Sequence, residues 1–336
     1  LENCERRDDT KRLVEMLFIS SADIEKYTHY PALIEGLKLA FEKQYKIPKR
    51  HHHQYPNPKE GVESTLLLMP AWDDGENLGV KVVNVSPNNS RHGLPTIQGN
   101  YLLFDLQTGT PKAVFDAKML TNKRTAAASA LASRFLSRKD ASCLLMIGNG
   151  SLAPELIKAH VTVRPITKVY LWGRNFEKSE LLAKQLAVLG IAITPVKDYI
   201  SYVQQADIIS CATLSATPFI FGENLKAGQH YDLVGAYKPD MREADDTFIS
   251  RVSIHVDNYE GATTETGDLV IPLSEGVITR TQIVSEMFEL CRSERVGRES
   301  DTEITCFKSV GHALEDLVAA QLVYDNYRKE KLVDNK

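Results

Sequence analysis

The sequence predicts an α/β protein that contains a Rossmann-type, doubly wound dinucleotide-binding domain. A short apolar run at residues 144–147 breaks at a glycine-rich turn, and helix-forming residues resume at Leu152. Beyond this turn, apolar runs of strand length alternate with helical segments over residues 168–235. Several of these runs end in small or polar residues, where a parallel sheet presents its ligand-facing edge. Alternating strands and helices are typical of a parallel, doubly wound sheet.

The turn after the first of these strands has the spacing of a dinucleotide-binding loop, G-x-G-x-x-A. Gly148 would make the tight turn, Gly150 would let backbone N–H groups approach a pyrophosphate, and Ala153 would allow close packing. The following helix N-terminus would offer unpaired N–H groups and a partial positive charge to the phosphates. A plain strand-to-helix turn can share this spacing. The residues expected to contact the cofactor here are Gly148, Asn149, Gly150, Ser151, Leu152 and Ala153.

The strand at residues 168–172 indicates which dinucleotide is bound. An NAD-binding unit places Asp or Glu at the end of this strand to hold the ribose 2′-hydroxyl. This chain has Gly173, Arg174 and Asn175 instead, a cation and an amide that suit a 2′-phosphate. We therefore expect NADPH to be preferred, with NADH as the alternative cofactor. A purely solvated Arg174 at a strand end is the competing interpretation.

Later segments continue the alternation. A helix over 177–189 and a strand over 191–196 are followed by two buried strands over 206–213 and 230–235. The nicotinamide is expected at the ends of these last two strands. The cofactor-binding residues predicted there are Ala212, Thr213, Val234, Gly235 and Ala236.

Length and composition suit two domains with ample core. The chain has 336 residues and a formal net charge of −4, which gives no electrostatic reason to expect nucleic acid. No apolar stretch is long enough to span a bilayer, so no membrane association is expected. Five cysteines without C-x-x-C spacing favour reduced thiols and a cytoplasmic protein. Residues 1–15 are highly charged and precede Met16, and we interpret them as a leader or an expression remnant.

The segment from Met16 to residue 132 predicts an α+β unit. It contains an amphipathic helix over 31–45 and strands over 64–69, 79–85, 100–105 and 111–116, the last two joined by a hairpin turn. We expect these strands to be antiparallel. A bare sheet face is a liability, so dimerisation is predicted to cover it.

Three cations in this unit are candidates for ligand binding. Lys81 lies inside an apolar strand, where a lysine is costly unless it faces a wet cleft or a partner. Arg124 begins an Ala-rich helical stretch and would point toward an anion or a carboxylate, and Arg50 is the third. A salt-bridged structural role is the alternative for each. We expect few acidic partners for them within this domain.

Several motifs resemble the ornithine cyclodeaminase/μ-crystallin family. They are GLPTIQGNYLLFDLQTGTPKAVFDAKMLTNKRTAAASALASRFL, IGNGSLA, SCATLSATP, VGAYKPDMREAD and FKSVGHALEDLVAAQLVYD, and they span about residues 16–327. The resemblance implies a homodimer in which residues 16–132 and 308–330 form the substrate-binding and dimerisation domain. Residues 133–307 would form the NAD(P)-binding domain.

The same resemblance carries roles for individual residues. Arg50, Lys81 and Arg124 match positions that bind the substrate carboxylate and neighbouring groups. Ser309 and Gly311 match a family position near the cofactor, and Asp316 would brace the last helix. These roles are expectations from the family.

One position separates the activities within that family. Ornithine cyclodeaminases carry an aspartate in V-G-A-D, whereas this chain has Tyr237. Tyrosine, with an unperturbed pKa near 10, cannot act as a carboxylate base at neutral pH. The segments PKRHHHQYPNP, STLLLMPAW and GAYKPDMRE are more similar to the branch that reduces cyclic imino acids. That branch converts Δ1-pyrroline-2-carboxylate to L-proline and Δ1-piperideine-2-carboxylate to L-pipecolate.

The resulting hypothesis needs no metal. Arg124, assisted by Arg50, would hold the substrate carboxylate through charge-assisted hydrogen bonds. A proton source near the ring nitrogen should help hydride addition, and Lys81, His52 and His53 are the candidates. In an extended segment His52 would share a face with Arg50, although a solvated loop at the histidines is equally compatible.

The sequence is also compatible with two other functions. One is a different enzyme on the same scaffold, either ornithine cyclodeaminase or a related amino-acid dehydrogenase. The other is a non-catalytic, NADPH-binding protein like the crystallins of the family.

Overall fold

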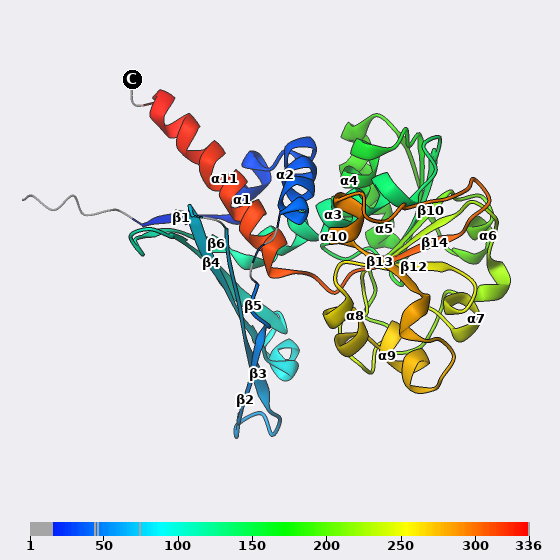
Figure 1. The fold of residues 1–336 in the computed structure, drawn as a ribbon, viewed down its shortest axis with the longest axis horizontal. Helices are drawn as coiled ribbons and strands as arrows, with labels where there is room; N and C mark the ends of the chain where they lie inside the picture. The colour runs from blue at the N-terminus through cyan, green and yellow to red at the C-terminus, as the bar shows by residue number, and fades with distance from the viewer. Residues whose placement is uncertain (1–15, 44, 46, 74, 335–336) are drawn as a thin grey trace, which may run out of the picture.

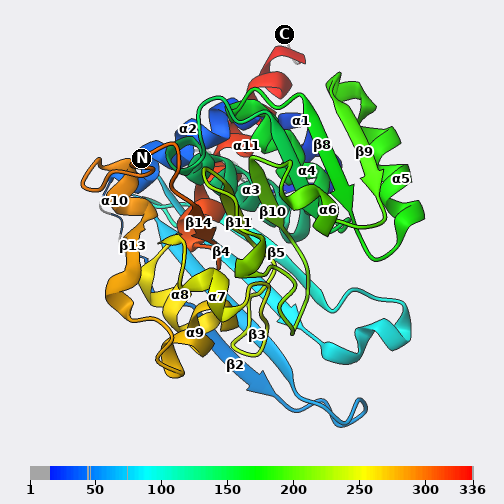
Figure 2. The ribbon, with the colours of Figure 1, turned by 90° about the vertical axis from the view of Figure 1, so that its right-hand side faces the viewer.

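The computed structural model describes residues 16–43, 45, 47–73 and 75–334 as two lobes, each built on its own β-sheet (Figure 1). The leader predicted at residues 1–15 lies outside the described residues. The first lobe holds the N-terminal sheet and the C-terminal helix, and the second holds the middle of the chain. A view turned by 90° shows the second lobe in front of the long strands of the first (Figure 2).

The first sheet has six strands in the order β1-β6-β5-β4-β3-β2. Its neighbours are antiparallel from β2 to β6, and the predicted hairpin between β5 and β6 is confirmed. The four strands predicted for this unit are antiparallel, as expected, and β1, which was not predicted, pairs with β6 in parallel. A helix of the same layer directly follows both β1 and β6, so these two strands run in the same direction. The strands are β1 (Leu17–Ile19), β2 (His51–Tyr55), β3 (Ser64–Trp72), β4 (Asn77–Val85), β5 (Ile97–Asp105) and β6 (Pro111–Asp116).

Helices cover one face of this sheet. A capping box between Ser20 and Asp23 starts the first helix, and Asp116 caps the long Ala-rich one by accepting the Met119 N–H. Small alanine side chains let that long helix be buried on most of its surface, so it carries little amphipathic pattern. The helices are α1 (Ser21–Tyr27), α2 (Tyr30–Glu42), α3 (Ala117–Leu136) and α11 (Ala313–Asp334), with a short 3₁₀ turn η1 (Pro87–His92) on the far loop.

The second sheet has eight strands, all parallel, in the order β13-β12-β14-β11-β10-β7-β8-β9. The predicted doubly wound fold is therefore confirmed. Its strand order reverses between β7 and β10, and a ligand of such a sheet binds outside the carboxyl ends of the strands at that point. The strands are β7 (Cys143–Ile147), β8 (Lys168–Trp172), β9 (Ala192–Val196), β10 (Ile208–Cys211), β11 (His230–Leu233), β12 (Ser253–Val256), β13 (Ile283–Glu286) and β14 (Thr305–Lys308).

Short helices join these strands and cover the sheet. They are α4 (Ala153–Val163), α5 (Phe176–Gln185), α6 (Ile200–Val203), α7 (Asp246–Ile249), α8 (Tyr259–Glu265), α9 (Gly267–Ser274) and α10 (Met287–Cys291), with 3₁₀ turns η2 (Leu186–Leu189), η3 (Gly222–Asn224) and η4 (Arg280–Gln282). The domain boundary expected after residue 132 falls inside α3, which packs against both α2 and α4. The division into domains stays a prediction.

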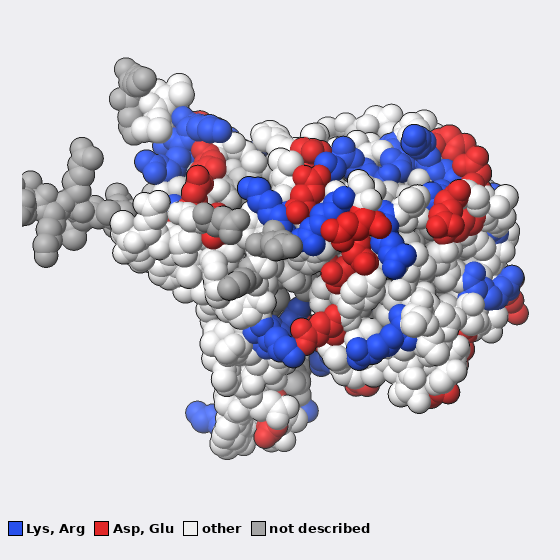
Figure 3. Space-filling view, in the orientation of Figure 1, with Lys and Arg blue, Asp and Glu red and all other residues white. Residues whose placement is uncertain are grey.

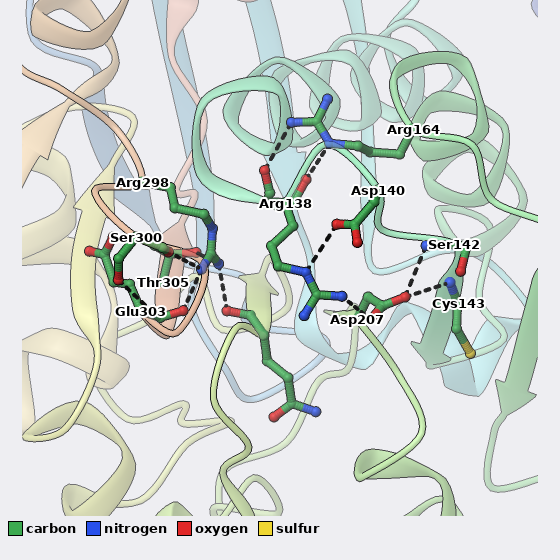
Figure 4. A network of polar contacts seen from close by, with 12 residues as sticks. Arg138, Asp140, Ser142, Cys143, Arg164, Asp207, Arg298, Ser300, Glu303 and Thr305 are labelled. Carbon is green, nitrogen blue, oxygen red and sulfur yellow. Dashed lines mark hydrogen bonds and ion pairs between the residues drawn. The ribbon is translucent and has the colours of Figure 1, made fainter.

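Hydrogen bonds and an ion pair from arginine side chains link the C-terminal end of α3 to the second lobe (Figure 4). Arg164 and Arg298 donate to main-chain carbonyls in and after the last turn of α3, and the Arg298 Nε to Leu136 O distance is 2.7 Å. Just beyond the helix, Arg138 pairs with Asp207 at 2.8 Å, and Asp207 also accepts two N–H groups at the start of β7. Because α3 also carries Arg124, these bonds fix that side chain relative to the dinucleotide sheet.

Two further findings concern the described part of the chain. Cys143, Cys211, Cys291 and Cys306 are free thiols, and three of them are buried. No helix in this part combines the length and the apolar character needed to cross a membrane.

Candidate functional site

The glycine turn after β7 has the geometry that a dinucleotide requires. Gly148 has a φ of +118°, and a Cβ there would lie 2.5 Å from the carbonyl oxygen of Ala212, so only glycine fits. A Cβ on Gly150 would meet nothing within 4 Å, which leaves open space in front of the turn. Helix α4 begins at Ala153, immediately behind that space. The expectation of unpaired N–H groups in its first turn is wrong, because Ala153 and Glu155 donate to the carbonyls of Gly150 and Leu152 and Pro154 has no N–H, so the helix can offer only the partial positive charge of its N-terminus. These residues fit a pyrophosphate.

The end of β8 lies beside this turn, as the sequence predicted. Asn149 Nδ2 donates to the carbonyl of Asn175 at 2.7 Å and to Ser179 Oγ at 2.9 Å. A Cβ on Gly173 would come within 2.1 Å of the Asn149 side chain, so glycine is required there too. Arg174 is exposed at this strand end. The two loops predicted to bind the adenosine half of a dinucleotide thus lie side by side.

A buried carboxylate that the sequence analysis did not single out joins the ends of β10 and β11. Glu243 accepts the Thr213 N–H at 2.9 Å, the Thr213 hydroxyl at 2.8 Å and the Gly235 N–H at 2.8 Å. Val234 and Ala236 flank Gly235 on the same edge, where Ser309 follows β14. The residues predicted for the nicotinamide half therefore share one edge of the sheet.

The three candidate cations come from separate elements of the first lobe. Lys81 lies in β4 and is buried, with its Nζ 2.6 Å from Asp316 Oδ2. Arg124 lies in α3, with Nε 3.1 Å from Asp316 Oδ1 and Nη1 2.7 Å from Glu315. Arg50 precedes β2 and pairs with Glu265 at 3.2 Å.

Gly311 lies between the two arginines. Arg50 Nη2 donates to the Gly311 carbonyl at 2.8 Å. A Cβ on Gly311, which has a φ of +86°, would lie 2.5 Å from Arg124 Nη1. Buried Asp257 fixes this loop by accepting the N–H groups of Val310 and Gly311. Both guanidinium groups are therefore held against one backbone position, next to the ligand edge of the second sheet.

The expectation of few acidic partners is wrong. Helix α11 returns to the first sheet and supplies Glu315 and Asp316, and α8 of the second lobe supplies Glu265. These carboxylates are far from the cations in sequence, which is why local context did not reveal them. They orient Arg124 through Nε and Nη1, and no hydrogen bond from Nη2 is formed within the described residues.

Burial and neighbouring charges tune the ionisation of this cluster. Burial lowers the pKa of Lys81 to about 8, and the Arg124 charge adds to this effect while Asp316 opposes it. Burial would raise the pKa of Asp316, but Lys81 and Arg124 hold it below its usual value. Burial raises the pKa of Glu315 to about 7 even beside Arg124. Lys81 can therefore exchange a proton near neutral pH.

A cavity of about 420 Å³ lies beside Arg50, and neither Lys81 nor Arg124 is among the described residues that line it. Arg50, His52, Glu265, Gly311 and His312 line it. Arg50 and His52 thus share the cavity, whereas His53 is not among the described residues that line it. His312, which we did not predict, packs its ring against Phe288, and burial lowers its pKa to about 4.

A larger cavity, of about 710 Å³, lies near the start of β7 and the C-terminal end of α3. It is lined by Arg134, Arg138, Arg164 and Arg298, among others. The guanidinium groups of Arg164 and Arg298 are already bound to carbonyl and hydroxyl oxygens (Figure 4). This cavity is remote from the glycine turn, so the smaller one is the better candidate for a substrate.

The fold and the site together define a dinucleotide-binding protein with a second, cation-lined lobe. The model of the ornithine cyclodeaminase/mu-crystallin family matches residues 14–331. The chain belongs to this family, and the predicted family membership is confirmed.

Relatives and solved structures agree with this assignment. A Δ1-pyrroline-2-carboxylate reductase of Colwellia psychrerythraea is 38% identical over 322 residues, covering 95% of this chain and 100% of that protein. The Thermococcus litoralis Δ1-pyrroline-2-carboxylate reductase, solved with NADH and L-proline, superposes with a TM-score of 0.88 at 34% identity, covering 94% of this chain and 98% of that one. An archaeal alanine dehydrogenase dimer with bound NAD has a TM-score of 0.86 at 28% identity and covers 94% and 97%.

Proposed function

We propose that the protein reduces cyclic imino acids with NAD(P)H, converting Δ1-pyrroline-2-carboxylate to L-proline and Δ1-piperideine-2-carboxylate to L-pipecolate. The observation that carries this proposal is the convergence of Arg50, Lys81 and Arg124 beside the ligand edge of the dinucleotide sheet. The similarity to Δ1-pyrroline-2-carboxylate reductases over nearly the whole chain supports it.

The arginines would bind the substrate carboxylate. Glu315 and Asp316 fix the Arg124 guanidinium through two of its nitrogens, so Nη2 is presented in a set orientation. Arg50 is fixed in the same way by Glu265 and the Gly311 carbonyl. Hydrogen bonds between a guanidinium and a carboxylate are charge-assisted and strong. Such preorganised donors place the imine carbon of the substrate toward the cofactor edge.

Lys81 would supply the proton. A bound nicotinamide provides the hydride for the imine carbon, and the ring nitrogen must gain one proton. A lysine with a pKa of about 8 is mostly charged at neutral pH and is still acidic enough to donate. Asp316, 2.6 Å away, holds the ammonium in place before transfer. His52 is the alternative donor, but partial burial and the charge of Arg50 lower its pKa, so it is mainly neutral.

NADPH would be the preferred cofactor. The segment from Gly173 to Asn175 has no carboxylate to bind a ribose 2′-hydroxyl, and Arg174 is exposed there to pair with a 2′-phosphate. The solved relatives named above bind NADH or NAD, so NADH is the competing cofactor. Comparison of the KM values for NADPH and NADH with one imine substrate tests this preference.

Tyr237 distinguishes the reductase from the cyclodeaminase. It is half-buried after β11, and the Lys238 ammonium lies over its ring at 5.6 Å from the centroid. For a reductase, Tyr237→Phe should cost about 0.5–1.5 kcal/mol, the value of one neutral hydrogen bond. Arg124→Ala should cost about 3 kcal/mol or more of transition-state stabilisation, a loss above a hundredfold in rate.

The deciding assay follows NADPH oxidation with Δ1-pyrroline-2-carboxylate, run beside ammonia release from L-ornithine with NAD⁺. Imine reduction without ammonia supports the reductase. Ammonia release that depends on Tyr237 would replace it with the cyclodeaminase, and tight NADPH binding without either turnover would indicate a non-catalytic binding protein.

The first sheet would form the interface of a homodimer. One row of partly exposed apolar side chains crosses its open face in register, from Phe18 through Val114, Leu102 and Val80 to Pro70. Phe18 is 67% exposed, which is unusual for a phenylalanine in a sheet. On the face shown in Figure 3, large areas without charged residues lie over this lobe, whereas charges of both signs mix over the other. Such a surface suits an obligate interface.

Light scattering at micromolar concentration should report a dimer or a multiple of it. A stable, active monomer would contradict this placement of the sheet face. A cytoplasmic location, which we also propose, rests on the four free thiols of the described residues.

A further inference from the structure

Glu243 is a fully buried carboxylate whose contacts all lie behind the proposed nicotinamide site. Its two oxygens accept three hydrogen bonds, two from Thr213 and one from Gly235. Two of these donors are backbone N–H groups, which cannot turn to become acceptors. A Cβ on Gly235 would lie 2.3 Å from Glu243 Oε1 and 2.0 Å from the Thr213 carbonyl oxygen, so the three groups are packed without spare room.

A second set of contacts fixes Glu243 from behind. The N–H groups of Glu243 and Ala244 donate to Asp268 at 2.7 and 3.2 Å, and Lys308 Nζ lies 3.0 Å from the other Asp268 oxygen. Asp268 begins α9, and Lys308 ends β14. Glu243 therefore ties the ends of β10 and β11 to a rigid frame.

We propose that Glu243 is a positioning residue for the cofactor: its ionised carboxylate shapes the ends of β10 and β11 for the nicotinamide, and protonation of that carboxylate weakens cofactor binding. The inference rests on the proposed function, because the nicotinamide is placed there by that proposal. A proton on Oε2 would face the Gly235 N–H, and a proton on Oε1 would face the Thr213 N–H or force the Thr213 hydroxyl to turn and accept it, so the hydrogen bonds of the ionised form cannot all be kept. Strand ends that lose such a bond no longer hold the shape that the cofactor requires.

The surroundings of Glu243 make this protonation accessible. Burial raises the pKa of Glu243 to about 7, Asp268 adds to this increase, and Lys308 opposes it. The other titratable groups that face it are the buried thiols of Cys211 on β10 and Cys306 on β14. The pKa of each thiol is well above its usual value because of burial, so both stay neutral across this range.

The test measures the dissociation constant of NADH by fluorescence titration at pH 6 and pH 8, without substrate. NADH is the correct probe, because the 2′-phosphate of NADPH would itself titrate near pH 6. With a carboxyl pKa of about 7, the ionised fraction falls about tenfold between these two pH values, so affinity should fall by up to tenfold. Glu243→Gln places an amide against one of the donors, so it should bind NADH about tenfold more weakly at pH 8 and show no further loss at pH 6.

Two other variants keep the test decisive. Asp245→Asn is the matched control, because Asp245 also accepts two backbone N–H groups, at 2.9 and 2.7 Å, but away from the cofactor edge. It should lower stability and leave the NADH profile unchanged. If Glu243→Gln does not fold, Thr213→Val removes only one donor to the carboxylate and should move the midpoint of the pH profile upward.

Several results would overturn the proposal. Wild-type NADH affinity in Glu243→Gln would refute it. A pH dependence of NADH affinity in Glu243→Gln that equals that of the wild type would also refute it, and it would point instead to Glu315, whose pKa burial also raises to about 7. An unmoved midpoint in Thr213→Val would also refute it. If the wild type binds neither NADH nor NADPH even at pH 8, the proposed function falls as well, whereas tight NADH binding that is unaffected by Glu243→Gln refutes only the role of Glu243.

Discussion

Replacing Gly311 with alanine should damage substrate binding while sparing cofactor binding. Gly311 has a φ of +86°, and its carbonyl accepts a hydrogen bond from Arg50. The added Cβ would lie 2.5 Å from Arg124 Nη1 and 2.8 Å from Nη2, closer than Cβ atoms approach other groups. The backbone cannot move away easily, because Asp257 holds the N–H of Gly311 at 2.6 Å. The guanidinium of Arg124 must therefore shift.

The effect has two parts of different size. A left-handed backbone conformation costs a non-glycine residue about 1–2 kcal/mol, which lowers stability. Displacing Arg124 removes a hydrogen bond to the substrate carboxylate, and hydrogen bonds to charged groups contribute about 1.5–3 kcal/mol. We therefore expect kcat/KM for the imine to fall about ten- to 150-fold.

The assay compares steady-state imine reduction, NADH affinity and thermal unfolding. Gly109→Ala is the matched control, because Gly109 has a φ of +68° but no atom within 4 Å of its would-be Cβ. Both variants should lose the stability that a left-handed backbone costs, and Gly311→Ala should lose more because it also displaces Arg124 from its ion pairs. Only Gly311→Ala should lose activity, with NADH affinity within about twofold of wild type. Equal kcat/KM values for the two variants would refute the placement of Arg124 in the substrate site.

Three further predictions concern proton transfer, cofactor choice and stability. If Lys81 donates the proton, kcat/KM for imine reduction should fall as the pH rises through about 8, because the Lys81 ammonium loses its proton there. Lys81→Met should abolish this decrease in the pH–rate profile. Arg174→Ala should weaken NADPH binding by about 1–3 kcal/mol and leave NADH binding unchanged; an unaltered KM for NADPH would argue against pairing with the 2′-phosphate. Burial lowers the pKa of His255 to about 4 in the folded protein, whereas its value in the unfolded chain is near 6.5. As the pH falls, His255 is therefore protonated in the unfolded chain before it is protonated in the folded protein, which favours unfolding. The free energy of unfolding in urea should therefore decrease between pH 7.5 and pH 5, and by less in His255→Gln.

Local pattern was sufficient to predict the strand–turn–helix geometry in which we expect the dinucleotide to bind. The roles of Gly148 and Gly150 depend on backbone geometry within one turn, and that geometry is encoded by adjacent residues. The confirmed strands on either side are apolar runs of ordinary length. By contrast, β1, β12, β13 and β14 were not predicted, because three or four residues are too few to show a period. The equally short β10 and β11 were predicted from their longer apolar surroundings and their small-residue ends.

The partners of the cations could not be found in the same way. Lys81 and Asp316 are 235 positions apart, and only the return of α11 to the first sheet brings them to 2.6 Å. From the sequence, Asp316 is expected only to brace its own helix. Glu243 lies in the motif VGAYKPDMREAD, but nothing in its neighbours shows that its side chain turns back to the ends of two strands. Such contacts are set by tertiary structure rather than by periodicity.

The return of α11 also has a consequence for how the protein is made. The first sheet is synthesised early, yet Lys81 and Arg124 within that lobe lack their counter-charges until Glu315 and Asp316 have left the ribosome. Removing one partner of a buried ion pair typically costs about 3–5 kcal/mol. The first lobe, although it is synthesised early, should therefore reach its stable folded state only after α11 has been synthesised. A nascent chain that stops before residue 313 would hold a dinucleotide fold beside an unfinished substrate site. Activity should therefore appear only in the last stage of synthesis, and truncation of this helix should be as damaging as mutation of the site itself.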